Sequence, residues 1–89
     1  MANESQYVFI GLMYEEGQGV EKDDAEAVEW YRKAAEQGDA SAQFNLGLMY
    51  EEGQGVEKDD AEAAEWYRMA AEQGDEKAKQ ALDRLSEEA

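Results

Sequence analysis

The chain has 89 residues, a formal net charge of -15, and neither Cys nor His. Its length suits one small domain. The charge opposes binding to nucleic acids and anionic membranes. Without Cys or His, the chain lacks disulfides, thiolate chemistry, the commonest metal ligand and the commonest general base. No apolar run approaches the roughly 20 residues needed to span a bilayer, and no targeting signal is present, so the sequence predicts a soluble chain, cytoplasmic if expressed as written.

The sequence repeats itself with a period of 36 residues. The segment GLMYEEGQGVEKDDAEA at residues 11–27 returns unchanged at residues 47–63, and the identity continues as far as Asp39 and Asp75. Such a period is typical of stacked helical hairpins. Two pairs interrupt the identity: Val28/Ala64 and Lys33/Met69.

Start and stop signals place five helices in chain order. Asn3 with Gln6 opens the first helix, and Asp23 with Glu26 resembles a capping box that opens the second. Glycines end each first helix of a hairpin, and Val56 is the one apolar residue of the connector that follows residue 52, where it is expected to plug the underside of the hairpin. The helices are expected at residues 4–16, 24–37, 40–52, 60–73 and 76–88.

Apolar residues recur at helical spacing, and nothing indicates strands, which predicts an all-α fold. One hairpin cannot bury its apolar face alone, so we expect an α/α solenoid of about two 36-residue hairpins, at residues 3–38 and 39–74. Residues 75–89 form a capping helix of the same single domain. It keeps Leu82 and Leu85 for the core and carries polar residues where internal units have apolar ones.

The residues from Ala42 to Asp75 follow the pattern AxxxLGxMYxxGxGVxxDxxxAxxWYxxAAxQGD. This pattern resembles a Sel1-like repeat, a relative of the tetratricopeptide repeat with a longer loop between its helices. The resemblance covers nearly the whole chain. It implies an α/α solenoid whose first helices line a concave surface, in a family of adaptors for protein complexes that have no chemistry of their own.

Exposed residues of the two units also coincide, among them Glu16 with Glu52 and Lys22 with Lys58. Surface positions in neighbouring natural repeats normally diverge. The coincidence favours a consensus-based or engineered repeat protein, with a recent duplication as the alternative.

The resemblance also implies which positions line the concave surface. Aligning the tetratricopeptide repeat on Leu46, Gly47 and Tyr50 predicts an apolar floor of Val8, Phe9, Leu12, Phe44 and Leu48, with Ser5, Ser41 and Asn45 among them and an acidic rim that includes Glu15 and Glu51. These faces carry no Lys or Arg, so the carboxylate-clamping function of chaperone-type tetratricopeptide grooves is not expected. Ordinary repeat packing is the alternative for each apolar position.

Several further features of the sequence are candidate sites. Tyr7 lies beside the floor but occupies a position that can pack into the neighbouring hairpin, and Met69 extends an apolar contact patch or is a harmless surface residue. The Trp and Tyr residues of the second helices are expected in the core. The acidic loops lack the ligand spacing of an EF-hand, and no nucleophile with a partner base is evident. We therefore expect no metal, no cofactor and no enzymatic activity.

The sequence thus predicts a protein-interaction module that binds a protein or peptide with apolar anchors and basic flanks. Nucleic acid and membrane are not expected partners. The alternative is a structural repeat protein with no foreign ligand, which forms a homodimer through Tyr7, Val8 and Phe9 of its first helix.

Overall fold

The computed structural model describes residues 3–88, except the side chain of Glu4, and contains five helices and no strand in that range. The helices are α1 (Glu4–Glu16), α2 (Asp24–Glu36), α3 (Ala40–Glu52), α4 (Asp60–Glu72) and α5 (Glu76–Glu88). The all-α solenoid predicted from the sequence is therefore confirmed. None of the described helices is long and apolar enough to cross a membrane.

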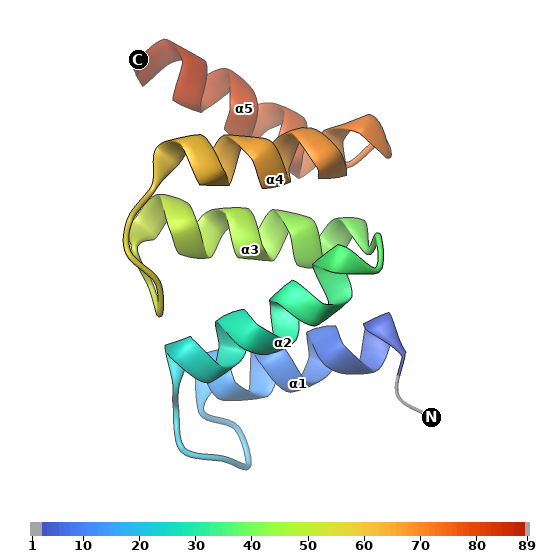
Figure 1. Cartoon of the computed structure of the whole chain (residues 1–89), viewed down its shortest axis with the longest axis vertical. Helices are drawn as coiled ribbons and strands as arrows, with labels where there is room; N and C mark the ends of the chain where they lie inside the picture. The colour runs from blue at the N-terminus through green and yellow to red at the C-terminus, as the bar shows by residue number, and fades with distance from the viewer. Residues whose placement is uncertain (1–2, 89) are drawn as a thin grey trace.

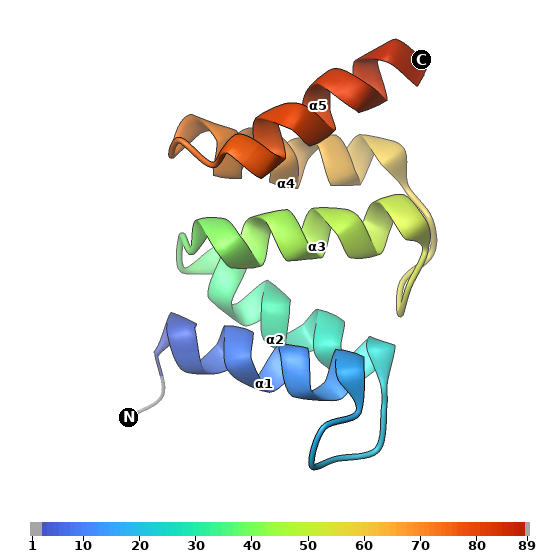
Figure 2. The same ribbon diagram turned by 180° about the vertical axis from the view of Figure 1, so that it is seen from behind.

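The helices form two layers. Helices α2 and α4 lie on the near side in Figure 1, and α1, α3 and α5 lie on the near side in Figure 2, which shows the opposite face. Each helix packs mainly against its neighbours in the chain, as in a solenoid. The layer of α1, α3 and α5 is called the groove face below, and the layer of α2 and α4 the outer face.

Polar caps fix the helix starts where the sequence predicted them. The Asn3 side chain accepts a hydrogen bond from the Gln6 amide at 3.1 Å, and the Gln6 side-chain oxygen accepts one from the Asn3 amide, which completes a capping box. Asp23 accepts from the Glu26 amide at 3.1 Å, but in the described residues no Glu26 side chain completes that box. The second helices are therefore held by a single Asp cap.

The second helices end one residue earlier than predicted, at Glu36 and Glu72. The Gln37 amide donates to the Ala34 carbonyl at 3.1 Å and the Gly38 amide donates to the Ala35 carbonyl at 3.0 Å, so the last turn tightens. Gly38 has a φ of 98°, a conformation that favours glycine. The same arrangement recurs at Gln73 and Gly74.

The core consists largely of alanine and tyrosine. Small side chains bring the helices close together, and the two tyrosines of the second helices fill the space between them. One cluster lies in the first unit and at the junction with α3, and another joins α4 to α5. The buried members are Ala27, Val28, Tyr31, Ala34, Ala35, Ala42, Leu46 and Met49 in the first cluster and Ala63, Tyr67, Ala70, Ala78 and Ala81 in the second.

The connector of the second unit lies against the first unit. A Cβ on Gly55 would stand 2.8 Å from the amide nitrogen of Ala25, at the start of α2. Val56, the predicted plug, is half-buried and packs against the first core cluster. The connector thus contributes to the contact between units as well as joining α3 to α4.

Glycines inside the first helices admit the tyrosine rings. Tyr67 Cε1 lies 2.5 Å from the point where a Cβ on Gly47 would stand, and Tyr31 Cε1 lies 2.6 Å from the same point on Gly11. No real Cβ atom tolerates such a distance, so each ring can lie against the helix backbone only because these positions are glycine.

We expect Gly47→Ala to destabilise the protein by about 1 to 3 kcal/mol, because the added methyl overpacks the contact with Tyr67 by more than the gain in helix propensity offsets. Urea unfolding measures the change. Ser41→Ala on the same helix is the control, since Ser41 is exposed and should tolerate the change. Equal stability of Gly47→Ala and the parent would contradict the role given to this contact.

Candidate interaction groove

A shallow hollow crosses the groove face. It has a volume of about 500 Å³ and is lined by residues of three helices that are far apart in the sequence. Its apolar floor comes from α1 and α3, and its polar edge from α3 and the start of α5. The lining residues are Val8, Leu12, Ser41, Phe44, Asn45, Asp75, Glu76 and Lys77.

The hollow contains only part of the predicted site. Val8, Leu12 and Phe44 of the predicted floor line it together, and Leu12 is 37% exposed. Phe44 also packs against Tyr67, with ring centroids 5.7 Å apart. Leu48 is half-buried and packs against the second core cluster. The floor available to a ligand is therefore formed mainly by Val8, Leu12 and one face of Phe44.

Phe9 and Tyr7 lie outside this hollow. Phe9 is 64% exposed and lines a separate hollow with Ser5, Gln6 and Ile10. Tyr7 packs against Trp30 of α2, with ring centroids 5.7 Å apart. The helical positions explain the separation, because residues adjacent in a helix point about 100° apart.

The predicted concave positions of the first two units carry no Lys or Arg, but the last helix adds cations to the groove face. Lys77 of α5 lines the main hollow and, with Arg84, an adjoining hollow beside Phe44. These residues stand 36 positions after Ser41 and Leu48, which line the same face in the preceding unit. The repeat register therefore places both cations on this face of α5.

The two rim glutamates are held by the buried tyrosines. The Tyr31 hydroxyl donates to Glu15 Oε1 at 2.6 Å, and the Tyr67 hydroxyl donates to Glu51 Oε1 at 2.7 Å. Burial raises the pKa of Tyr31 far above its usual range, and the nearby Glu15 carboxylate raises it further. Burial and the nearby Glu51 carboxylate likewise raise the pKa of Tyr67. Both tyrosines therefore stay neutral donors at all ordinary pH values.

Of these two glutamates, only Glu51 also binds an arginine among the described residues. Both guanidinium amino groups of Arg84 donate to its carboxylate, Nη2 to Oε1 at 3.0 Å and Nη1 to Oε2. The Glu51 side chain is 13% exposed. Its charge, which was predicted to lie on the rim, is paired with Arg84 within the chain. Arg84 lowers the pKa of Glu51, while burial opposes this shift and the Tyr67 hydrogen bond adds to it.

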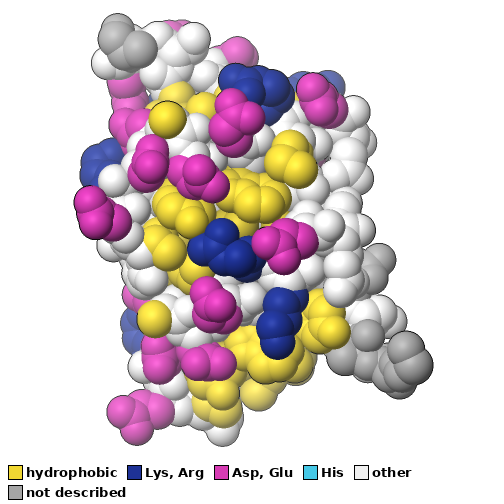
Figure 3. Space-filling model, viewed as in Figure 1, with side chains coloured by type: hydrophobic (Ala, Val, Ile, Leu, Met, Phe, Trp, Pro, Cys, Tyr) yellow, Lys and Arg dark blue, Asp and Glu magenta, His cyan; other side chains and the backbone are white. Residues whose placement is uncertain are grey.

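The outer face combines apolar patches with charges of both signs (Figure 3). The Lys33 ammonium lies 4.4 Å from the centroid of the Trp30 ring, and Arg32 donates to the Tyr50 hydroxyl at 2.9 Å. Met69 replaces Lys33 in the second unit and is 42% exposed. It lies on α4, away from the hollow of the groove face.

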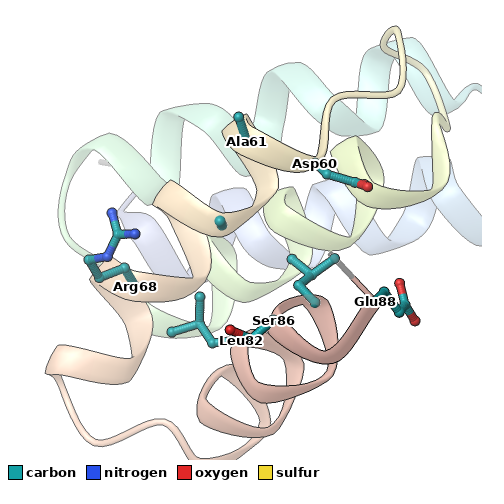
Figure 4. A pocket seen from close by; sticks show the side chains of 8 residues that line it. Asp60, Ala61, Arg68, Leu82, Ser86 and Glu88 are labelled. Atoms are coloured by element: carbon teal, nitrogen blue, oxygen red, sulfur yellow. The ribbon is translucent and has the colours of Figure 1, made fainter.

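A further hollow of about 350 Å³ lies between α4 and α5, next to Leu82 and Arg68 (Figure 4). Ala64 lines it, whereas Val28 at the same place in the first unit is fully buried. The Val28/Ala64 difference is therefore a packing difference. Leu82 and Leu85 are half-buried there and pack against the second core cluster.

None of the described residues forms a cluster of three or more acidic side chains that could hold a metal ion. The acidic connectors are instead tied by local pairs. Lys22 Nζ lies 2.8 Å from Asp24 Oδ1, and Lys58 Nζ lies 2.8 Å from Asp60 Oδ1. Both pairs are exposed and contribute little to stability.

Stacked helical hairpins with a grooved face define an α/α-solenoid scaffold. The Sel1 repeat matches residues 7–39 and 40–75, and the chain belongs to the Sel1 repeat family. Proteins of this family generally mediate protein–protein interactions. A comparison with curated proteins gives no match.

Three solved structures are similar to the chain. A Sel1 repeat protein from Oxalobacter formigenes shares 51% identity over 97% of this chain and 35% of its own, with a TM-score of 0.94. The protective antigen c5321 of uropathogenic Escherichia coli, which has an SLR fold, shares 49% identity over 88% of this chain and 17% of its own, with a TM-score of 0.87. Cysteine-rich protein B of Helicobacter pylori shares 32% identity over 89% of this chain and 59% of its own, with a TM-score of 0.85. The chain thus spans less than two thirds of each of these proteins.

We expect Glu51→Gln to lower stability at neutral pH by roughly 1 kcal/mol, because it removes the charge that Arg84 binds and solvent screens part of that pair. The folded-state pKa of Glu51 lies below the unfolded value of about 4.3, so the charge stabilises the fold above that value. The stabilisation is lost as the pH falls through the lower, folded-state pKa. Urea unfolding of parent and variant from pH 7 down to pH 3 would measure it.

Glu15→Gln is the matched control, since Tyr31 keeps an acceptor and no arginine is lost. Its stability difference from the parent should be smaller. A Glu51→Gln difference that stays constant down to the lowest pH would contradict the assignment.

Proposed function

We propose that the groove face binds a peptide or helix of another protein through the hollow lined by Val8, Leu12 and Phe44. The observation that supports this most is the position of these side chains: they leave an apolar floor open to solvent across two units, with polar residues around it. Interfaces commonly combine such an apolar centre with a polar rim. No part of this proposal involves catalysis.

The ligand's chemistry follows from the charges around the floor. Glu15 and the overall charge of -15 attract basic flanks, while Lys77 gives the end of the hollow beside α5 a local positive charge. We therefore expect the apolar anchors of the bound peptide to lie near its own basic residues, and these basic residues to face α1. Met69 would take part only if the same partner also reached the outer face.

Selecting peptides from a random display library on the immobilised protein tests this proposal. We expect selected peptides to carry apolar anchors, to perturb NMR amide signals around Leu12 and Phe44, and to bind at least tenfold more weakly to Leu12→Asp, which places a charge in the apolar floor. Phe9→Asn is the control variant, since Phe9 lies outside the hollow. Peptides that bind the Leu12→Asp variant as tightly as they bind the parent would refute the proposal that this groove is the binding site.

A second candidate function is self-association through α1. The exposure of Phe9 favours it, because a large aromatic side chain that is 64% exposed beside Ile10 gives a seam for a symmetric dimer. The equivalent residue of the second unit is Asn45.

Light scattering over a concentration series tests the seam. If Phe9 forms it, the molar mass should rise above the 10.0 kDa of the single chain as concentration increases, and Phe9→Asn should restore the monomer without loss of helicity. A mass of one chain at every concentration would exclude the dimer and leave the groove proposal standing.

The unit boundaries at residues 38 and 74 and the consensus-based origin of the sequence stay predictions. The proposed binding function requires neither.

A further inference from the structure

The chain contains one completed and one incomplete copy of the same polar cluster. In the second unit, Glu51 accepts hydrogen bonds from Tyr67 and from both amino groups of Arg84. In the first unit, Glu15 accepts from Tyr31 with the same geometry. Within the described part of the chain, no cation forms an ion pair with Glu15.

The register of the repeat explains the difference. Arg84 of α5 stands 36 positions after Leu48 of α3, so the repeat that follows Glu15 has a leucine at the position where the repeat that follows Glu51 has the arginine. A leucine side chain offers no donor to a carboxylate. The half-buried Glu15 is therefore fixed in position by Tyr31, while its Oε2 has no protein donor among the described residues.

We propose that Glu15 recognises an arginine side chain of a partner peptide, in the way that Glu51 binds Arg84. The inference rests on the proposed groove function and names the chemistry of one contact within it. Arginine fits better than lysine, since its planar guanidinium can donate to both carboxylate oxygens at once, as Arg84 does.

The floor of the groove gives the arginine a neighbour. Leu12 lies one helical turn before Glu15 on the same face of α1 and lines the hollow. A peptide whose arginine reaches Glu15 can thus place an adjacent apolar side chain against Leu12. The ligand class is a segment in which arginine stands next to a large apolar residue, and the chain's net charge of -15 favours its approach.

An NMR titration of the full, 15N-labelled chain tests the site. The probe is N-acetyl-leucyl-arginine amide, and the control probe carries citrulline, which keeps the shape of arginine without its charge. We expect the arginine probe to shift the amide signals around Glu15 and Tyr31 with millimolar affinity, and the citrulline probe to bind roughly tenfold more weakly. Glu15→Gln should weaken the arginine probe by a similar factor while keeping an acceptor for Tyr31.

Two reciprocal variants sharpen the test. Leu48→Arg supplies the missing cation within the chain and should abolish binding at Glu15, provided that circular dichroism shows an intact fold. Arg84→Leu restores the residue of the internal repeat and should open a second site, seen as new shifts around Glu51 and Tyr67. Shifts of equal size in Glu15→Gln and the parent, or an Arg84→Leu protein that gains no shifts at Glu51, would overturn the proposal.

The two proposals can fail separately. If library peptides bind the hollow of Glu15→Gln as tightly as that of the parent, the arginine site is wrong and the groove function stands. If the arginine probe binds at Glu15 while no selected peptide engages the hollow, the arginine site stands and the groove function is wrong.

Discussion

The close approach of a tyrosine ring to a glycine inside a neighbouring helix is the constraint on which this structure depends. Because Gly11 and Gly47 have no Cβ, Tyr31 and Tyr67 lie against the helix backbone and reach a glutamate one turn further along. One contact thus sets the distance between the two helices of a hairpin and also holds a carboxylate on the groove face. Packing and surface chemistry are coupled through the same side chain, so the rim glutamates have fixed positions although they lie near the ends of their helices.

The sequence predicts the fold of this chain almost completely, because each helix boundary is marked by local chemistry. Asp and Asn caps mark the starts, and glycines with positive φ mark the ends. The exception is the last turn of α2 and of α4, where the amides of Gln37 and Gln73 bond to the carbonyl three residues back and the helix ends one residue early. Such tightening depends on how the turn is closed in space, and residue type alone does not encode it.

The candidate site is predicted less completely than the fold. Aligning positions on a related repeat identifies Val8, Leu12 and Phe44, since their direction follows from the helical register. It does not reveal that Tyr7 packs against Trp30, or that Arg84 reaches back to pair with Glu51. Both depend on long side chains crossing between helices, where small differences in packing decide which partner is reached.

The connector of the second unit contacts the unit before it in the chain. Gly55 lies against the start of α2, and Val56 packs against the first core cluster, so the second hairpin holds on to the first through its loop as well as its helices. The connector around Gly19 is placed differently: a Cβ on Gly19 would lie 3.7 Å from Met13 Cε, within its own hairpin. Among the described residues, a pulling force must therefore break more contacts to detach the connector of the second hairpin than to detach that of the first.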